Sequence, residues 1–287
     1  MKNAYSIGVD IYQKVTKFYQ SFEGQKRVIG KSLLGRNLYA VKVGEGAPVG
    51  LAQYALHGRE YITAMLALRH AQIGVKEGSL WLLPLCNPDG ALLSQVGLES
   101  VFPASRRRRL TVLNGGREDF SLWKANARGV DLNVNFDAEW GKGAKNRRFA
   151  GSENYIGSAP FSEPETQALK RFTLKIKPDY TISYHTKGEE IYWYFYQPIS
   201  RCAKDKALAL ALSRSTGYRL AHAKGSAGGY KDWCIQALKI PSFTIEAGAE
   251  ELLHPIRSAK GLIKKNKRAL FDLSKEYCLH YEKIDAR

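Results

Sequence analysis

Residues 49–60, VGLAQYALHGRE, join a mostly apolar run to a short polar motif. The apolar part, Val49 to Leu56, has the length of a buried strand, and strands buried on both faces belong mainly to parallel sheets. The polar part, His57–Gly58–Arg59–Glu60, leads directly into a segment in which Ile62 and Leu66 have helical spacing. A strand, a polar turn and a helix in this order predict an α/β fold.

The alternation of strands and helices continues on both sides of this stretch. The sequence predicts further strands at residues 28–31, 38–43, 80–85, 180–184 and 242–245. It predicts helices at residues 5–22, from the capping motif at 162–165 to about residue 176, at 204–216, and from Pro255 onward. The segment Asn87–Pro88–Asp89–Gly90 predicts a turn, and residues 91–160 predict a region made largely of loops. Because no linker interrupts this pattern, we expect a single domain over residues 1–287 with a mixed, mostly parallel sheet covered on both faces.

Polar side chains follow three of the predicted strands at the point where each strand ends. His57 and Glu60 come after the first of these strands, His185 ends the second, and Glu246 ends the third. Open α/β sheets bind ligands just beyond the carboxyl ends of their strands. We therefore expect these four side chains to meet at one edge of the sheet.

Two histidines and a glutamate are a known ligand set of catalytic zinc sites, which keep a further position for water. His57 and Glu60 lie three residues apart, so both can point to one side of a turn that enters a helix, and His185 would supply the third ligand. The sequence thus predicts about one zinc ion per chain. A His-x-x-Glu pair alone would be weak support, because such pairs are common in proteins without a metal.

Hydrolysis at such a site needs a base and a positive group. A bound zinc lowers the pKa of its water, and a carboxylate such as Glu246 can accept the proton, although a structural salt bridge is the alternative role. The oxyanion needs a second positive charge, for which Lys124 and Arg128, in WKANAR at residues 123–128, are the candidates. The alternative for both is a solvated basic face.

The formal charge of +17 favours anionic partners through long-range attraction. The densest basic run, Arg106–Arg109, predicts a solvated loop, with capture of an anionic substrate as the alternative. Neither a nucleic-acid motif nor interleaved aromatic residues accompany it, so we do not expect a nucleic-acid partner. The apolar runs are too short to span a bilayer, and residues 1–20 lack the apolar core of a signal peptide, so a complete chain would be cytoplasmic. The oligomeric state is left open.

Five motifs occur in the order and spacing of the zinc carboxypeptidase A family, which the chain resembles from about Arg27 to Glu250. They lie at residues 57–60, 87–90, 129–133, 183–185 and 242–246. The resemblance implies an α/β/α sandwich around a mixed, mostly parallel eight-stranded sheet, with zinc on His57, Glu60 and His185 and with Glu246 as general base. It also implies that Asn133 holds the terminal carboxylate of the substrate, and that Lys124, or alternatively Arg128, stabilises the oxyanion.

Two further stretches, residues 185–193 and 226–233, resemble a bacterial branch of this family, the γ-D-glutamyl-diaminopimelate peptidases and murein peptide amidases. These enzymes cut peptidoglycan stem peptides. The resemblance implies a peptidoglycan-derived peptide as substrate and cleavage at the bond between γ-D-Glu and meso-diaminopimelate. Lys231 would pair with the side-chain carboxylate of diaminopimelate, and Glu189 or Glu190 would accept its ammonium group.

Two positions depart from the family pattern. Val134 stands where the family usually has an arginine for the C-terminal carboxylate, and Lys224 stands near the place of the tyrosine that closes over the substrate, which leaves Tyr230 or His222 as a substitute. The alternative function, a carboxypeptidase that removes C-terminal acidic residues from ordinary peptides, rests on Lys231. A non-catalytic binding protein is disfavoured, because all three ligands and the base are present.

Overall fold

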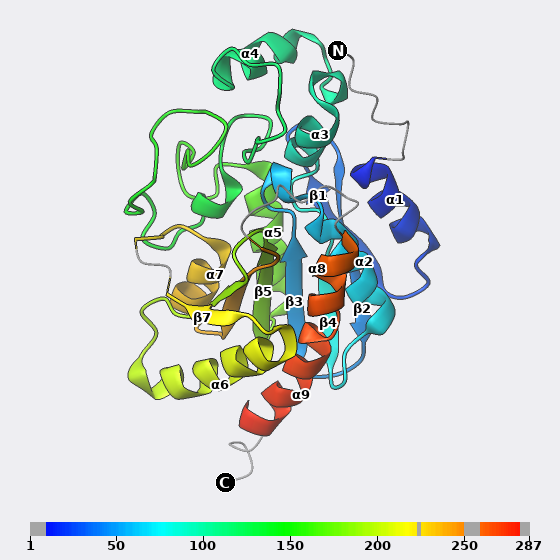
Figure 1. Ribbon diagram of the computed structural model, residues 1–287, viewed down its shortest axis with the longest axis vertical. Helices are drawn as coiled ribbons and strands as arrows, with labels where there is room; N and C mark the ends of the chain where they lie inside the picture. The colour runs from blue at the N-terminus through cyan, green and yellow to red at the C-terminus, as the bar shows by residue number, and fades with distance from the viewer. Residues whose placement is uncertain (1–9, 223–224, 250–258, 282–287) are drawn as a thin grey trace.

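The computed structural model describes residues 10–222, 225–249 and 259–281. Its centre is a mixed eight-stranded sheet with the order β1-β2-β4-β3-β5-β8-β6-β7 (Figure 1). The strands are β1 (Lys26–Lys31), β2 (Asn37–Gly44), β3 (Val49–Tyr54), β4 (Ser79–Leu83), β5 (Tyr180–His185), β6 (Glu190–Tyr192), β7 (Arg219–Ala221) and β8 (Ser242–Glu246). The central strands β4, β3, β5 and β8 run parallel, and antiparallel pairing begins at β2 and β6. The predicted sheet is confirmed.

Helices cover both faces of the sheet (Figure 1). They are α1 (Ile11–Ser21), α2 (Thr63–Ile73), α3 (Pro88–Val96), α4 (Ser105–Leu113), α5 (Pro164–Ile176), α6 (Ile199–Thr216), α7 (Tyr230–Trp233), α8 (Ala259–Asn266) and α9 (Ala269–Tyr281). One core cluster joins the sheet to α2, α6, α8 and α9 through residues such as Leu66, Leu212 and Leu273. A second cluster joins it to α5 and α7 through Phe172 and Trp233. Every residue of β4 and β5 is buried, which fits the apolar sequence of β4 after Ser79, whereas β5 also buries the polar side chains of Thr181, Ser183 and His185.

Two helices occupy a region that the sequence predicted as a turn and a loop. Asn87 caps α3, with its side chain accepting a hydrogen bond from Gly90 N at 2.9 Å, and Pro88 lies in the first turn. Asparagine followed by proline is favoured at a helix start as well as in a turn, and this is why the turn prediction was wrong. The four consecutive arginines lie in α4, so the predicted solvated loop was wrong too, in keeping with the high helix propensity of arginine.

Other differences concern short or terminal elements. The strands β6 and β7 are three residues long, too short for a recognisable alternation, and were not predicted. Helix α6 begins at Ile199, five residues before the predicted start. The predicted helix at 5–22 is confirmed as α1, except that residues 5–9 lie outside the described residues. The start of the predicted C-terminal helix at Pro255 lies outside them as well, and two helices, α8 and α9, follow.

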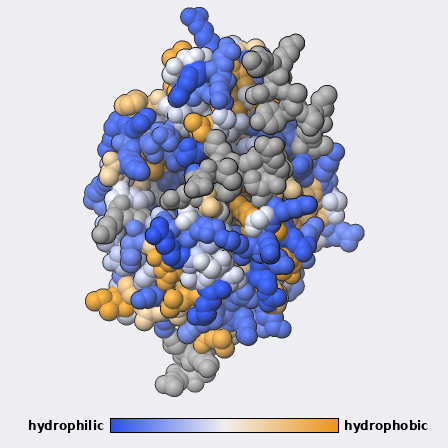
Figure 2. Space-filling view, viewed as in Figure 1, coloured by the Kyte–Doolittle hydropathy of each residue, from blue (hydrophilic) through white to orange (hydrophobic). Residues whose placement is uncertain are grey.

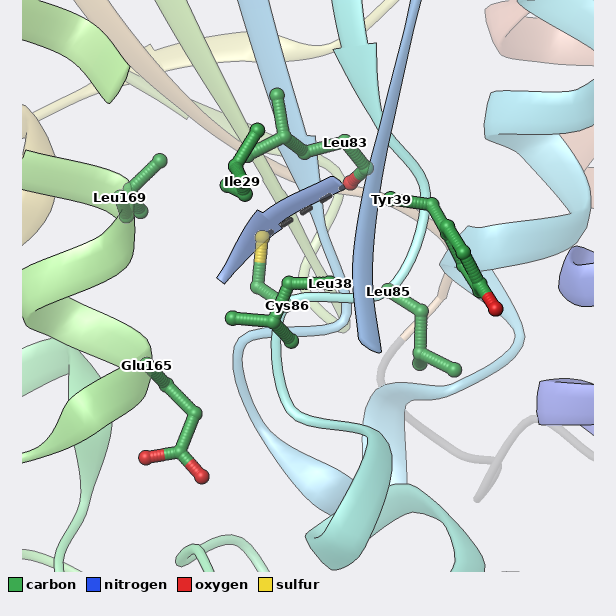
Figure 3. Close-up of a pocket in the computed structure, with 8 residues that line it drawn as sticks. All are labelled: Ile29, Leu38, Tyr39, Leu83, Leu85, Cys86, Glu165 and Leu169. Carbon is green, nitrogen blue, oxygen red and sulfur yellow. Dashed lines mark hydrogen bonds between the residues drawn. The ribbon is translucent and has the colours of Figure 1, made fainter. Parts of the chain in front are cut away.

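A small pocket lies between α5 and the strands β1, β2 and β4 (Figure 3). Cys86 lies there and donates a hydrogen bond from Sγ to Leu83 O at 3.8 Å. Burial raises the pKa of the Cys86 thiol to about 12, which keeps it protonated. Cys86, Cys202, Cys234 and Cys278 all lie within the described residues, and none of them is in a disulfide.

One face of the molecule is shown in Figure 2, and it is mostly hydrophilic. Its hydrophobic areas are small and separate, so this face does not indicate a large apolar docking surface. Within the described residues, no helix combines the length and the hydropathy that a bilayer span requires.

The register of the central strands brings the predicted site residues to one edge of the sheet. Tyr54 of β3 pairs with Tyr184 of β5, and His185 at the end of β5 pairs with Glu246 at the end of β8. Because these strands are parallel, the segment that follows β3, with His57, arrives at the same edge.

Candidate metal centre

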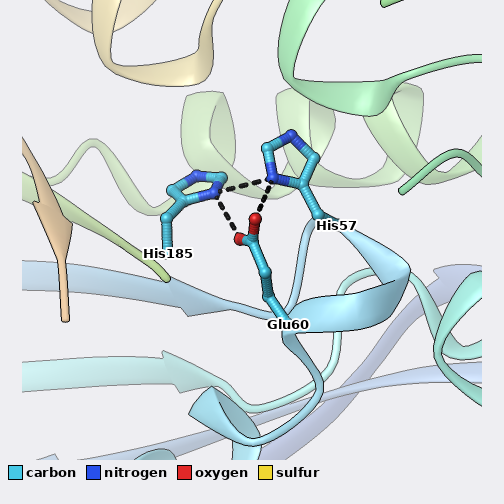
Figure 4. Close-up of side chains that lie close together, drawn as sticks. All are labelled: His57, Glu60 and His185. Carbon is cyan, nitrogen blue, oxygen red and sulfur yellow. Dashed lines mark hydrogen bonds and ion pairs between the residues drawn. The ribbon is translucent and has the colours of Figure 1, made fainter. Parts of the chain in front are cut away.

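His57, Glu60 and His185 converge at this edge (Figure 4). The Glu60 carboxylate lies 2.8 Å from His57 Nδ1 through Oε1 and 2.9 Å from His185 Nδ1 through Oε2, and the two Nδ1 atoms are 3.1 Å apart. All three residues are buried, and their ligand atoms lie within 4.8 Å of one another. Two imidazole nitrogens that face each other need a proton or a cation between them. The His₂Glu donor set fits zinc, as the sequence predicted.

The backbone around His57 and Glu60 is held tightly by neighbouring loops. Gly58 N donates a hydrogen bond to Lys124 O at 2.9 Å. A Cβ atom at Gly58 would lie 2.4 Å from Gly90 O, so no other residue fits without moving the α3 terminus. The glycine between the two ligands is therefore required by close backbone packing.

Asn87 connects the same loops through its side chain. Its Nδ2 donates hydrogen bonds to Leu56 O at 3.2 Å and to Ala125 O at 3.1 Å, and its Oδ1 caps α3. The motif at residues 87–90 thus has a structural role: it locks the loop after β3 to the loop that carries Lys124.

Asp131 supports the cluster from the other side of His57. Its Oδ1 is 3.1 Å from His57 Nε2, and its Oδ2 is 3.4 Å from Lys124 Nζ. A carboxylate on the second nitrogen of a metal-binding histidine fixes the orientation of the ring. Asp131 was not among the site residues predicted from sequence, although it is an acidic residue inside the motif at 129–133.

The pKa values of these groups follow from their neighbours. Burial has the largest single effect on His57 and lowers its pKa, but the charges of Glu60 and Asp131 together outweigh it and bring the pKa to about 9. Burial raises the pKa of Glu60, but His57 and His185 outweigh it and hold the pKa below its ordinary value. Burial of Lys124 lowers its pKa, yet Asp131 and Glu60 leave that pKa raised overall. The site therefore keeps its carboxylate ligand ionised and its lysine charged.

Glu246 stands beside this cluster as the sequence predicted. It is partly exposed and lies opposite His185 in the β5–β8 pair. Burial, and then the like charge of Glu60, raise the pKa of Glu246 to about 8, against the opposing effects of His57 and Lys124. A carboxyl group whose pKa lies near neutral can both accept and return a proton.

The two candidates for oxyanion stabilisation lie in different surroundings. The Lys124 side chain is 16% exposed, pairs with Asp131, and its charge influences His57 and Glu246. The Arg128 side chain is 46% exposed, and its Nε lies 3.3 Å from the buried carboxylate of Glu163. The structure thus brings Lys124 to the metal cluster and ties Arg128 to the segment that precedes α5.

Asn133 and Tyr230, both predicted to contact the substrate, lie next to each other. Asn133 is partly exposed, and its Oδ1 accepts a hydrogen bond from Tyr230 N at 3.3 Å. The Tyr230 ring is completely buried, with its hydroxyl 2.8 Å from Thr173 Oγ1. Tyr230 is therefore a core side chain, and the prediction that it contacts the substrate was wrong. Apolar packing between α7 and α5 buries its ring.

Lys231, predicted to bind a substrate carboxylate, is buried and already paired. Its ammonium group forms an ion pair with Asp232, donates to Tyr194 O at 3.1 Å, and lies 5.3 Å from the centre of the Phe195 ring. An anionic substrate group would have to compete with Asp232 for this charge.

Glu189 and Glu190 have internal partners as well. Glu189 Oε1 lies 2.6 Å from Lys265 Nζ of α8, and Glu190 pairs with Arg219. Glu190 also lies opposite Glu246 in the β6–β8 pair, so it is the nearer of the two to the predicted base along the sheet.

Several known proteins are similar to this chain in sequence or in fold. Residues 24–269 match the zinc carboxypeptidase family. Gamma-D-glutamyl-L-diamino acid endopeptidase 1 of Lysinibacillus sphaericus is 31% identical over 268 residues, which cover 85% of this chain and 65% of that protein. Murein peptide amidase A of Escherichia coli strain K12 is 28% identical over 208 residues, which cover 65% of this chain and 77% of that protein. The structure of bovine thrombin-activatable fibrinolysis inhibitor, in complex with a tick carboxypeptidase inhibitor, superimposes with a TM-score of 0.71 at 22% identity, over 92% of this chain and 93% of that one.

These similarities support conclusions of different scope. The bovine structure, at 22% identity, supports the fold alone. This chain spans less than two thirds of the length of the Lysinibacillus protein. The family match covers most of the chain, and zinc is the metal of this family, for which the buried His57, Glu60 and His185 offer three ligands. The chain belongs to the zinc carboxypeptidase family.

Proposed function

We propose that this chain is a zinc-dependent peptidase that hydrolyses amide bonds in peptidoglycan stem peptides, with Glu246 as general base. The observation that carries the proposal is the convergence of the His57, Glu60 and His185 cluster with Glu246 at the carboxyl ends of the adjacent strands β3, β5 and β8. Family membership supports the reaction class. The names of the two bacterial relatives support the substrate class.

The residues divide the work of hydrolysis among them. Zinc, when bound, supplies a Lewis acid that activates water and polarises the scissile carbonyl. Glu246 takes the proton of the attacking water and later delivers it to the leaving nitrogen. Lys124 stabilises the negative charge that develops on the carbonyl oxygen. Asp131 fixes the ring of His57 and keeps Lys124 charged.

The finer proposal is cleavage between γ-D-Glu and meso-diaminopimelate. The side chain of diaminopimelate ends in a carboxylate and an ammonium group, and Lys231 and the acidic pair Glu189 and Glu190 have the complementary charges. Val134 cannot form an ion pair with a free C-terminal carboxylate, so recognition would depend on the far end of diaminopimelate. Because these charged residues already have internal partners, binding of diaminopimelate would replace existing ion pairs instead of adding ion pairs.

A carboxypeptidase that removes acidic C-terminal residues from ordinary peptides is the second candidate. It is favoured by the buried cation of Lys231, which would suit an acidic side chain, and by the partly exposed Asn133.

The test compares defined muropeptides with ordinary peptides. The metal-loaded protein is incubated with diaminopimelate and lysine forms of the tripeptide and tetrapeptide, and with peptides that end in aspartate or glutamate, and products are identified by mass spectrometry. We expect free diaminopimelate from the tripeptide and diaminopimelyl-D-alanine from the tetrapeptide. The preference over the lysine form should be at most about tenfold in kcat/KM, the value of one charge-assisted hydrogen bond, since Lys231 keeps Asp232 as its partner when the substrate offers no carboxylate.

The variant Lys231→Met separates the two levels of the proposal. It should reduce the preference for diaminopimelate while hydrolysis continues. Equal rates on both stem peptides, unchanged by the substitution, would contradict the role of Lys231. Hydrolysis of the ordinary acidic peptides alone would establish the second candidate instead.

A further inference from the structure

A basic pocket lies beyond the metal centre, between α4 and the loop that carries Lys124. It has a volume of about 280 Å³ and is lined by Leu33, Arg106, Arg109, Ala127 and Arg128. We refer to it as the arginine pocket. Helix α4 lies at the top of the view in Figure 1, well away from the lower helices α6 and α9.

Three segments that are distant in sequence build the arginine pocket. Arg106 and Arg109 lie three residues apart on α4, so their side chains share one face of the helix. Ala127 and Arg128 come from the loop after α4, and Leu33 comes from the turn between β1 and β2. Three arginines from two segments therefore line one pocket together with the apolar Leu33 and Ala127.

The charges of the arginine pocket are only partly compensated. Arg128 is paired with Glu163, whose carboxylate is also bound by Asn126 Nδ2 at 2.8 Å. Arg106 and Arg109 form no ion pair or hydrogen bond through their side chains within residues 10–222, 225–249 and 259–281. Among the residues that the structure describes, no acidic side chain lines the pocket.

Two neighbouring arginines, unlike Arg106 and Arg109, have partners of their own. Arg36 pairs with the buried Asp89 at 2.7 Å. Arg107, between the two pocket arginines, donates to Val101 O and packs on the Phe102 ring. The fold thus uses these cations for packing and pairing, whereas Arg106 and Arg109 are left with their donors free toward the pocket, at a cost from mutual repulsion.

We propose that the arginine pocket binds an oxyanion group, a phosphate or a carboxylate, separately from the metal centre. Guanidinium groups bind both through paired, charge-assisted hydrogen bonds, so the shared chemistry is a planar or tetrahedral oxyanion. The third guanidinium, Arg128, is already oriented by Glu163 and lowers the cost of ordering the site. The two unpaired arginines, Arg106 and Arg109, have no role in the proposed peptidase activity, so failure of this site and failure of the peptidase proposal are distinguishable.

The test measures anion binding directly on the zinc-loaded protein. Inorganic phosphate and succinate are titrated separately at constant ionic strength, and the arginine Nε–Hε signals are followed by NMR. We expect saturable shifts of a few arginine signals with dissociation constants of about millimolar order, since a small anion gains only a few hydrogen bonds. A response to phosphate alone, to succinate alone or to both identifies the source of the oxyanion.

Charge-matched variants locate the site. Arg109→Gln should weaken binding about tenfold, the loss expected for one charge-assisted hydrogen bond. Arg108→Gln removes the same charge from the adjacent position on the same helix and should change the affinity by less than about twofold. Equal weakening by both substitutions would show a diffuse effect of the net charge and overturn the proposal. The absence of saturable shifts with either anion would overturn it too.

Discussion

Three buried histidines of this protein behave in two opposite ways. His57 and His185 face one carboxylate, with their Nδ1 atoms 3.1 Å apart. His70, on α2, lies equally deep, but its Nδ1 is 2.7 Å from the Tyr54 hydroxyl and its Nε2 is 3.0 Å from Asn266 O. Each nitrogen of His70 thus has its own neutral partner.

The pKa values reflect this contrast. Burial lowers the pKa of His70 to about 4, whereas the Glu60 and Asp131 charges overcome burial at His57 and bring its pKa to about 9. Depth alone therefore does not distinguish a structural histidine from a metal ligand. The distinction comes from neighbours: neutral partners satisfy a ring, and a carboxylate shared by two rings prepares a site for a cation.

The largest effect is expected from removing a ligand. His185→Ala should remove zinc and abolish hydrolysis together, because two ligands are too few for a stable site. Zinc per chain is measured by atomic absorption alongside activity on a diaminopimelate tripeptide. If the variant kept its zinc at micromolar free metal, His185 would not be a required ligand, and its predicted difference from His70 would be wrong.

Glu246→Gln should separate metal binding from turnover. The amide cannot accept the proton, so kcat should fall about 10²–10⁴-fold, while zinc stays bound. Metal content and kcat are determined on the same preparation. Near-normal turnover would assign the base to another residue, with Glu190 across the β6–β8 pair as the first to examine.

Lys124→Ala and Arg128→Ala form a matched pair within one loop. We expect Lys124→Ala to lower kcat by about 10²–10³-fold, as for the loss of one oxyanion donor. Arg128→Ala should cause a much smaller loss, since its guanidinium is bound to Glu163. Steady-state kinetics of both variants decide the assignment, and the reverse order of effects would exchange the two roles.

The replacement His70→Phe should affect stability rather than chemistry. It leaves Asn266 O and the Tyr54 hydroxyl without this partner, at a cost of about 1–3 kcal/mol in the free energy of unfolding. Zinc per chain should not change. Urea denaturation and metal analysis report the two quantities, and zinc loss without a stability change would contradict the structural role of His70.

The same variant sharpens the comparison through pH. Because the folded pKa of His70 is depressed to about 4, the unfolded chain binds a proton there first as the pH falls below about 6.5. His70 therefore costs stability progressively between about pH 6.5 and 4, by up to about 3 kcal/mol. His70→Phe should lose less stability than the wild type over this interval. Parallel pH profiles of the two proteins would show that His70 does not titrate in this way.

Local patterns were enough for the central strands and for the metal ligands. The strand signals of β3, β5 and β8 lead to chemically distinctive side chains, so the sequence alone predicts His57, Glu60, His185 and Glu246 at one edge. The strands β6 and β7 could not be predicted, because three residues carry no usable periodicity. The start of α3 was misassigned because one motif serves two local structures.

The secondary roles depended on contacts between segments far apart in the chain. From sequence, Lys124 was the first candidate for the oxyanion and Arg128 the alternative, and Tyr230 and Lys231 were interpreted as substrate contacts. Their different environments arise from Asp131, Glu163, Thr173 and Asp232.

Residue spacing was thus sufficient for the fold class and the ligand set, because strand ends in a parallel sheet meet wherever hydrophobic runs end. Only the tertiary structure decided which cations are paired, which are free and which rings are buried. Those properties depend on distances of a few ångströms between side chains that sequence proximity does not control.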